Sequence, residues 1–201
     1  MSRKIIYYLI LTALIINIAN SATVRGIVKG KKVGSLTNAV VYVERIKDKK
    51  FVPPKTNVVL ETKSHSFSPH ILPILAGTTV EIPYYDNIKS CEYTHISFDK
   101  PEKGIKSESA KKALTFSNPG VLPLYCKIHN EMSAFIIVCE TPYFCVSDDK
   151  GNYKIQNIPE GKYKISVWQE DEFLKNKNLK TYKSIYISSK EDKIVNFTFS
   201  D

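Results

Sequence analysis

The sequence predicts an all-β protein built from two β-sandwiches. After residue 22, apolar residues occur in short runs or alternate with polar ones, as in Thr78–Ile82 and Val195–Phe199. Such alternation indicates half-buried strands. Turn signals rich in Gly, Pro and Asn separate the runs, for example Asn118–Gly120 and Ile158–Gly161. Many short strands divided by such turns favour sandwich architectures.

Strands are expected along the whole chain after residue 22. Ser66–Ala76 is predicted to be extended, because Pro69 and Pro73 exclude a helix interior and a central strand. The polar stretch Asp99–Lys112 is expected to form an irregular loop or a single helical turn. The other predicted strands are Val24–Lys29, Ala39–Ile46, Asn57–Thr62, Thr78–Ile82, Tyr93–Phe98, Ala113–Phe116, Val121–Cys126, Ser133–Cys139, Tyr153–Ile155, Tyr163–Val167, Thr181–Ile187 and Ile194–Phe199.

The first 22 residues have the composition of a secretory signal peptide. Arg3 and Lys4 precede the apolar stretch Ile5–Ile18, and small residues follow it, so that cleavage after Ser21 or Ala22 is expected. The apolar stretch is short for a membrane span, which needs about 20 residues. We therefore predict a periplasmic or otherwise exported protein that meets the membrane only through this signal. The alternative is an uncleaved N-terminal anchor.

The chain is basic, but its charge pattern does not indicate a nucleic-acid-binding protein. Its formal net charge is +9, and removing residues 1–22 takes away two of 29 basic residues and none of 20 acidic ones, leaving 27 − 20 = +7. The lysines are scattered and often alternate with apolar residues, as in Lys162–Ile165. A basic surface of this kind can steer an acidic protein partner toward the molecule.

One short run of residues carries a metal-ligand pattern. Cys126, His129 and Met132 are spaced three residues apart, and His95 lies upstream at the end of a predicted strand. A thiolate, two imidazoles and a weak axial thioether form the ligand set of a blue-copper electron-transfer site. Zinc is disfavoured because only one Cys and two His converge and Met is a poor zinc ligand.

The order of elements around this run resembles the cupredoxin family. Phe116–Gly120 followed by Leu124–Cys126 matches the approach to that family's ligand loop, and Ala76–Ile82 resembles one of its opening strands. The loop Cys126–Met132 has the length found in amicyanin-like members. The resemblance covers about residues 55–140 and implies a Greek-key β-sandwich that binds one type 1 copper ion.

The resemblance also assigns a role to each ligand residue. It implies that Cys126 is the thiolate ligand, His95 and His129 are the imidazole ligands, and Met132 is the weak axial ligand. His95 departs from the family pattern, because Ile96 stands where the family commonly has Asn. No residue is expected to be catalytic, since neither a catalytic triad nor a pair of carboxylates stands out, and we predict that the protein is not an enzyme.

The last part of the chain resembles a different module, the transthyretin-type, carboxypeptidase regulatory-like β-sandwich. The resemblance rests on Asp148–Tyr153, Ile158–Gly161 and Tyr163–Trp168, in which Gly residues form turns and Tyr and Ile form the core. Val24–Val28 and Asn38–Glu44 match the opening hairpin of the same module. The resemblance implies interaction or stabilisation and no catalysis.

These two resemblances suggest a nested domain arrangement. Residues 1–22 are the predicted signal peptide, residues 55–140 the cupredoxin domain, and residues 23–54 and 141–201 the discontinuous second sandwich. Insertion of one domain into another is physically easy where the chain ends lie close together. The alternative is a linear arrangement with a cupredoxin domain at 23–140 and a separate sandwich at 141–201.

The remaining cysteines and histidines receive structural interpretations. If Cys126 binds metal, three cysteines remain, and the proximity in sequence of Cys139 and Cys145 favours a disulfide between them, with Cys91 left over. His65 and His70 are interpreted as structural or exposed.

These observations predict an exported blue-copper protein that carries single electrons between periplasmic or membrane redox partners. Its basic surface favours an acidic redox protein as one of these partners. Proteins of the methylamine-utilisation type combine both modules, which implies redox work near a dehydrogenase or oxidase. The alternatives are a copper storage or delivery protein and a metal-free, cupredoxin-like binding protein.

Overall fold

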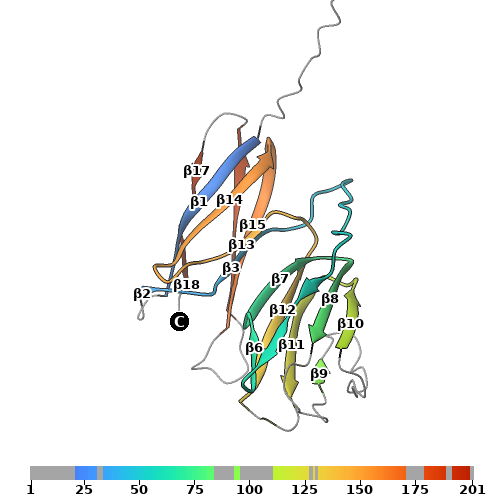
Figure 1. Cartoon of the computed structure of the whole chain (residues 1–201). Coiled ribbons are helices and arrows are strands. Elements are labelled where there is room, and N and C mark those ends of the chain that lie inside the picture. Colours follow the sequence, from blue (N-terminus) through green and yellow to red (C-terminus); the bar gives the residue numbers. More distant parts are fainter. Residues whose placement is uncertain are drawn as a thin grey trace, which may run out of the picture.

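The computed structural model describes residues 21–30, 34–83, 93–95, 111–126, 129, 131–170, 179–188 and 192–199, with residues 63, 93–95, 111, 112 and 179 described by their backbone alone. Every element in this part of the chain is a β-strand, which confirms the predicted all-β fold class (Figure 1). None of the described segments is a helix long and apolar enough to cross a bilayer. Residues 1–20 of the predicted signal peptide lie outside the described residues.

The first sandwich combines strands from the beginning and the end of the described chain (Figure 1). One sheet is arranged around β1 and consists of β1 (Ser21–Gly30), β2 (Gly34–Ser35), β14 (Asn152–Pro159), β17 (Lys193–Ile194) and β18 (Phe197–Phe199). The other sheet has the order β13-β3-β15-β16 and consists of β13 (Phe144–Val146), β3 (Val40–Val43), β15 (Gly161–Gln169) and β16 (Leu179–Ile187).

The core of the first sandwich lies between these two sheets. Tyr163, Ile165 and Val167 of β15 all point into it, as their alternation in the sequence predicts. Ala22 of β1 also belongs to this core, and Ser21 pairs with Pro159, so both predicted signal cleavage positions lie within β1.

The second sandwich is formed by the strands between β3 and β13. Its larger sheet has the order β7-β12-β11-β9 and consists of β7 (Ile71–Leu75), β12 (Ser133–Cys139), β11 (Gly120–Cys126) and β9 (Tyr93–His95). Its smaller sheet has the order β10-β8-β4 and consists of β10 (Lys111–Phe116), β8 (Thr78–Pro83) and β4 (Val58–Val59). A separate hairpin consists of β5 (Glu61–Lys63) and β6 (Ser66–Ser68).

Two local expectations about this sandwich can be compared with the structure. β7 lies at an end of its sheet, as Pro73 predicts, because proline cannot donate a ladder hydrogen bond. Of the stretch Asp99–Lys112, only its last two residues are described, and they form the start of β10 rather than a loop.

The two sandwiches meet along β12, which is buried on both faces. Ala134, Ile136 and Val138 point into the core of the second sandwich, with Leu72 and Val80 among their neighbours. The alternate residues of β12, Phe135, Ile137 and Cys139, form a third cluster with Ile71 of β7 and with Val40 and Trp168 of the first sandwich. Because successive strand residues face opposite sides, one apolar strand supplies both layers.

Phe135 and Trp168 are the large aromatic side chains of this interface. Their ring centroids lie 5.3 Å apart, and Trp168 is 2% exposed. Trp168 is also the only tryptophan of the chain, so its fluorescence reports on the contact between the sandwiches.

We expect Phe135→Ala to lower the free energy of unfolding by about 3–5 kcal/mol, because it leaves a cavity beside Trp168. The emission of Trp168 should shift to longer wavelength as water enters. Urea denaturation followed by fluorescence measures both effects. Val52→Ala is the control, since Val52 is 85% exposed and should change the free energy by no more than about 0.5 kcal/mol. Equal losses in both variants would contradict the assignment of Phe135 to a packed interface.

Candidate metal centre

The predicted ligand loop connects β11 to β12 at one end of the second sandwich. The backbone N–H of Cys126 donates to the carbonyl of Met132 over 3.0 Å, which continues the pairing of the two strands. The N–H of Met132 donates to the carbonyl of His129 over 2.9 Å. Cys126, His129 and Met132 are therefore connected by backbone hydrogen bonds.

Cys126 and His129 approach each other in this loop. The distance between Cys126 Sγ and His129 Nδ1 is 3.6 Å. With metal–sulfur and metal–nitrogen bonds of about 2.3 and 2.0 Å, two ligands of one metal lie about 3.5–3.7 Å apart at tetrahedral to trigonal angles. The separation of these two atoms therefore fits a shared metal ion.

Met132 and His95 are the other two predicted ligands. The Met132 side chain is 3% exposed and belongs to the same core cluster as Cys126. The backbone of His95 pairs with Leu124 of β11, and that of Tyr93 pairs with Cys126. His95 thus lies on the strand next to β11, two residue positions away from Cys126. The side chain of His95 is outside the described part of the structure.

The described side chains do not by themselves complete a metal site. Among them, no three His, Cys, Asp or Glu side chains converge on one point. Cys126 is disulfide-bonded in this structure. A sulfur atom in a disulfide is not a thiolate, so the predicted role of Cys126 as a copper ligand requires the reduced form.

The predicted disulfide between Cys139 and Cys145 is wrong, because both are free thiols. Cys139 lies in the interface between the sandwiches, whereas Cys145 packs against the core of the first sandwich. Closeness in sequence misleads here, since the chain changes from one sandwich to the other between the two residues. Burial raises the pKa of Cys139 to about 12 and that of Cys145 to about 11. Cys91, the fourth cysteine, lies outside the described residues.

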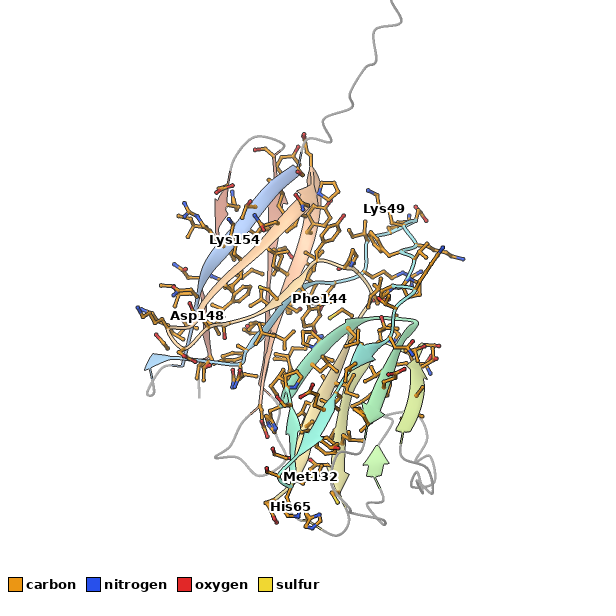
Figure 2. All side chains as sticks on the ribbon, in the orientation of Figure 1. Lys49, His65, Met132, Phe144, Asp148 and Lys154 are labelled. Atoms are coloured by element: carbon orange, nitrogen blue, oxygen red, sulfur yellow. The ribbon has the colours of Figure 1, made fainter. Side chains whose placement is uncertain are left out.

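His65 is a residue of this site that the sequence did not reveal. Its imidazole lies beside that of His129, with ring centroids 4.3 Å apart and an angle of 48° between the ring planes. Figure 2 shows His65 and Met132 at the same end of the second sandwich. The sequence interpretation of His65 as structural or exposed captures its exposure but misses this contact.

His70 connects the beginning of β12 to the first sandwich. Its Nδ1 lies 2.9 Å from the carbonyl oxygen of Ser133, to which it can only donate, and its Nε2 lies 2.6 Å from Oε2 of Glu170. Its ring also packs edge-on against Phe135. His70 is therefore a structural residue that links the strand after Met132 to the first sandwich.

Tyr125 precedes Cys126 and is 40% exposed. Burial, and secondarily the nearby carboxylate of Glu170, raises the pKa of its phenol. Tyr125 is thus neutral at physiological pH and brings no charge to the ligand loop.

Comparisons with known proteins found similar solved structures. The three similar structures described below each cover about half of this chain or less. No protein-family model matches the chain, and no curated protein matches it. A reduced amicyanin mutant is 14% identical over 48% of this chain and 98% of its own, with a TM-score of 0.36. A copper-containing nitrite reductase from Thermus scotoductus SA-01 is 23% identical over 49% of this chain and 25% of its own, also with a TM-score of 0.36. A purple cupredoxin from Nitrosopumilus maritimus is 21% identical over 41% and 99%, with a TM-score of 0.33.

Counting reactive thiols tests the cysteine assignment. At pH 8, pKa values of about 11 and 12 leave at most about one thiolate in 1,000 at Cys145 and fewer at Cys139. The folded, unreduced protein should therefore show no fast reaction with a thiol reagent such as dithiobis(nitrobenzoate). Unfolding without reductant should release the thiols of Cys139 and Cys145 but not that of Cys126, and reduction followed by unfolding should release all four thiols of the chain. Four thiols without reduction would show that Cys126 is not in a disulfide.

Proposed function

We propose that this protein is an exported type 1 copper protein that carries single electrons between periplasmic or membrane redox partners. The observation that carries the proposal is the 3.6 Å approach of Cys126 Sγ and His129 Nδ1, with the buried Met132 in the same closed loop. A thiolate, imidazoles and a thioether are the soft and borderline donors that copper prefers. A bound copper ion would supply the one-electron chemistry.

The protein's own part in this function is to hold the ligands still. Cys126 is 3% exposed at the end of the sandwich core, and two backbone hydrogen bonds connect Cys126 to Met132 and Met132 to His129. Ligands that cannot move change little between two oxidation states, so the electron moves without a large rearrangement of the chain. His129 is only half-buried and is proposed to be the side at which the electron leaves.

The proposed ligand set is Cys126, His129, Met132 and His95, and it applies to the reduced protein. The disulfide of Cys126 blocks thiolate coordination until a dithiol or phosphine reductant has opened it. The same disulfide favours a second candidate, a metal-free sandwich in which Cys126 has a structural role. Copper loading of the reduced protein distinguishes the two.

We further propose that the two sandwiches are nested domains and that the first is a carboxypeptidase regulatory-like module with a stabilising role. Strand pairing supports the division, because β1 and β3 pair with strands after residue 143, namely β14 and β15. The described strands of the other sandwich all lie between Val58 and Cys139.

Reduced protein, freed of reductant under anaerobic conditions, should bind one equivalent of Cu(II) and develop an intense visible thiolate-to-copper absorption band. The band requires a thiolate, so Cys126→Ser should abolish it. Absorption and paramagnetic-resonance spectra are the measurements. Unreduced protein should develop no such band.

Cys145→Ser is the matched control, because it removes a partly buried thiol of the other sandwich and should leave the band unchanged. His95→Ala and His129→Ala should each lose the band or convert it to a weaker spectrum. Reduced wild-type protein that stays colourless with excess copper would refute the proposed function and favour the metal-free sandwich.

The net charge supports an acidic redox partner. We expect the second-order rate of electron exchange with an acidic one-electron protein to fall several-fold between 10 and 300 mM salt, because the Debye length falls from about 30 to below 10 Å over this range. Stopped-flow kinetics measures it. An uncharged small-molecule reductant is the control and should show a flat salt dependence. A rate with the acidic protein that rises with salt would contradict this partner.

A further inference from the structure

We propose that His65 is a positioning residue that holds the imidazole of His129 with its Nδ1 toward Cys126. The inference rests on the proposed function for its meaning, but its geometric part can be tested without metal. It starts from the contact between the two rings, whose centroids lie 4.3 Å apart. The two residues are far apart in the sequence, so this contact is made by the fold and not by the local chain.

The backbone around His65 supports a role beyond a simple turn. Ser64 and His65 are the two central residues of the hairpin between β5 and β6, and their φ angles are +48° and +59°. Positive φ at both positions is the type I′ pattern, which strongly favours Asn and Gly. Ser64 and His65 are neither Asn nor Gly. Non-glycine residues with positive φ cost free energy and are concentrated at functional sites.

The geometry explains why this position requires a side chain. His129 lies in a short loop and is fixed through its backbone, since its carbonyl accepts from the N–H of Met132. That hydrogen bond does not fix the rotation of the ring. The His65 ring packs against it at a 48° tilt, a tilted aromatic contact that restricts this rotation. Groups that orient a metal ligand commonly change metal affinity by 10–100-fold when they are removed.

The hairpin itself is anchored to the core of the same sandwich. Phe67, two residues after His65, is 5% exposed and belongs to the cluster that also contains Cys126 and Met132. The turn therefore has a fixed position relative to the ligand loop, and glycine at position 65 would keep the hairpin while removing the imidazole.

Three variants of the full-length chain separate the possibilities. His65→Phe keeps a ring but loses the nitrogen atoms, His65→Ala removes the ring, and His65→Gly removes the ring and relieves the positive φ. In reduced, metal-free protein, the NMR signals of the His129 ring protons should move when the ring at position 65 is lost and stay near their wild-type positions in the Phe variant. After copper loading, the Ala and Gly variants should bind copper about ten-fold more weakly and give altered copper spectra.

The Gly variant gives the sharpest result, because its melting temperature should rise while its copper affinity falls. Asn157→Gly is the control: Asn157 is exposed, has a φ of +59° and lies in the other sandwich. It should raise the melting temperature without changing the His129 signals or copper binding.

Unchanged His129 signals in both ring-deleted variants would overturn the proposal. So would a second equivalent of bound copper that disappears with His65, since this would make His65 a ligand of its own site. If reduced wild-type protein binds no copper, the proposed function fails, whereas the metal-free NMR comparison still decides whether His65 positions His129.

Discussion

The burial of β12 on both faces is the constraint on which the rest of the structure depends. Its alternate residues fill the core of the second sandwich and the interface with the first, so neither layer can shift without disturbing the other. Phe135 and Ile137 face the interface, while Ala134 and Ile136 face the core. Because a slip of one residue would exchange the two faces, burial on both sides fixes the register of β12 strongly.

The position of the ligand loop follows from that register. Met132 immediately precedes β12, and Cys126 ends the neighbouring β11, so the strand pairing determines how the loop closes. His70 adds a second attachment at the same point, because the N–H of Phe135 donates to its carbonyl over 2.8 Å and its ring nitrogen bonds to Ser133. The first sandwich thus reaches the beginning of β12 through Glu170 and His70. Contacts from both sandwiches therefore hold the beginning of β12, next to the predicted ligand loop.

The sequence carries information on which residues are close neighbours in the chain, but not on which distant segments the fold brings together. Cys126, His129 and Met132 lie in one loop, and residues this close in the chain must lie close in space whatever the fold. Pro73 likewise restricts its own strand to a sheet edge. The contact of His65 with His129 depends instead on the position of the β5–β6 hairpin in the fold. The alternation of apolar and polar residues in the sequence carries no information about that position. Cys139 and Cys145 show the opposite case: they are close in the sequence but remain free thiols, because the chain passes from one sandwich to the other between them.

The covalent state of Cys126 links this local chemistry to the compartment of the protein. If the chain is exported, as we propose, Cys126 meets oxidising conditions, in which disulfides persist. A thiolate beside an imidazole would be a good copper ligand, and thiolates are also the form of cysteine that is oxidised. The sulfur of Cys126 can therefore either coordinate copper or be oxidised. Bound copper would protect it from oxidation by occupying its lone pair. Copper binding to Cys126 and disulfide formation at Cys126 exclude each other. The reaction that occurs first during maturation therefore determines whether Cys126 can serve as a copper ligand.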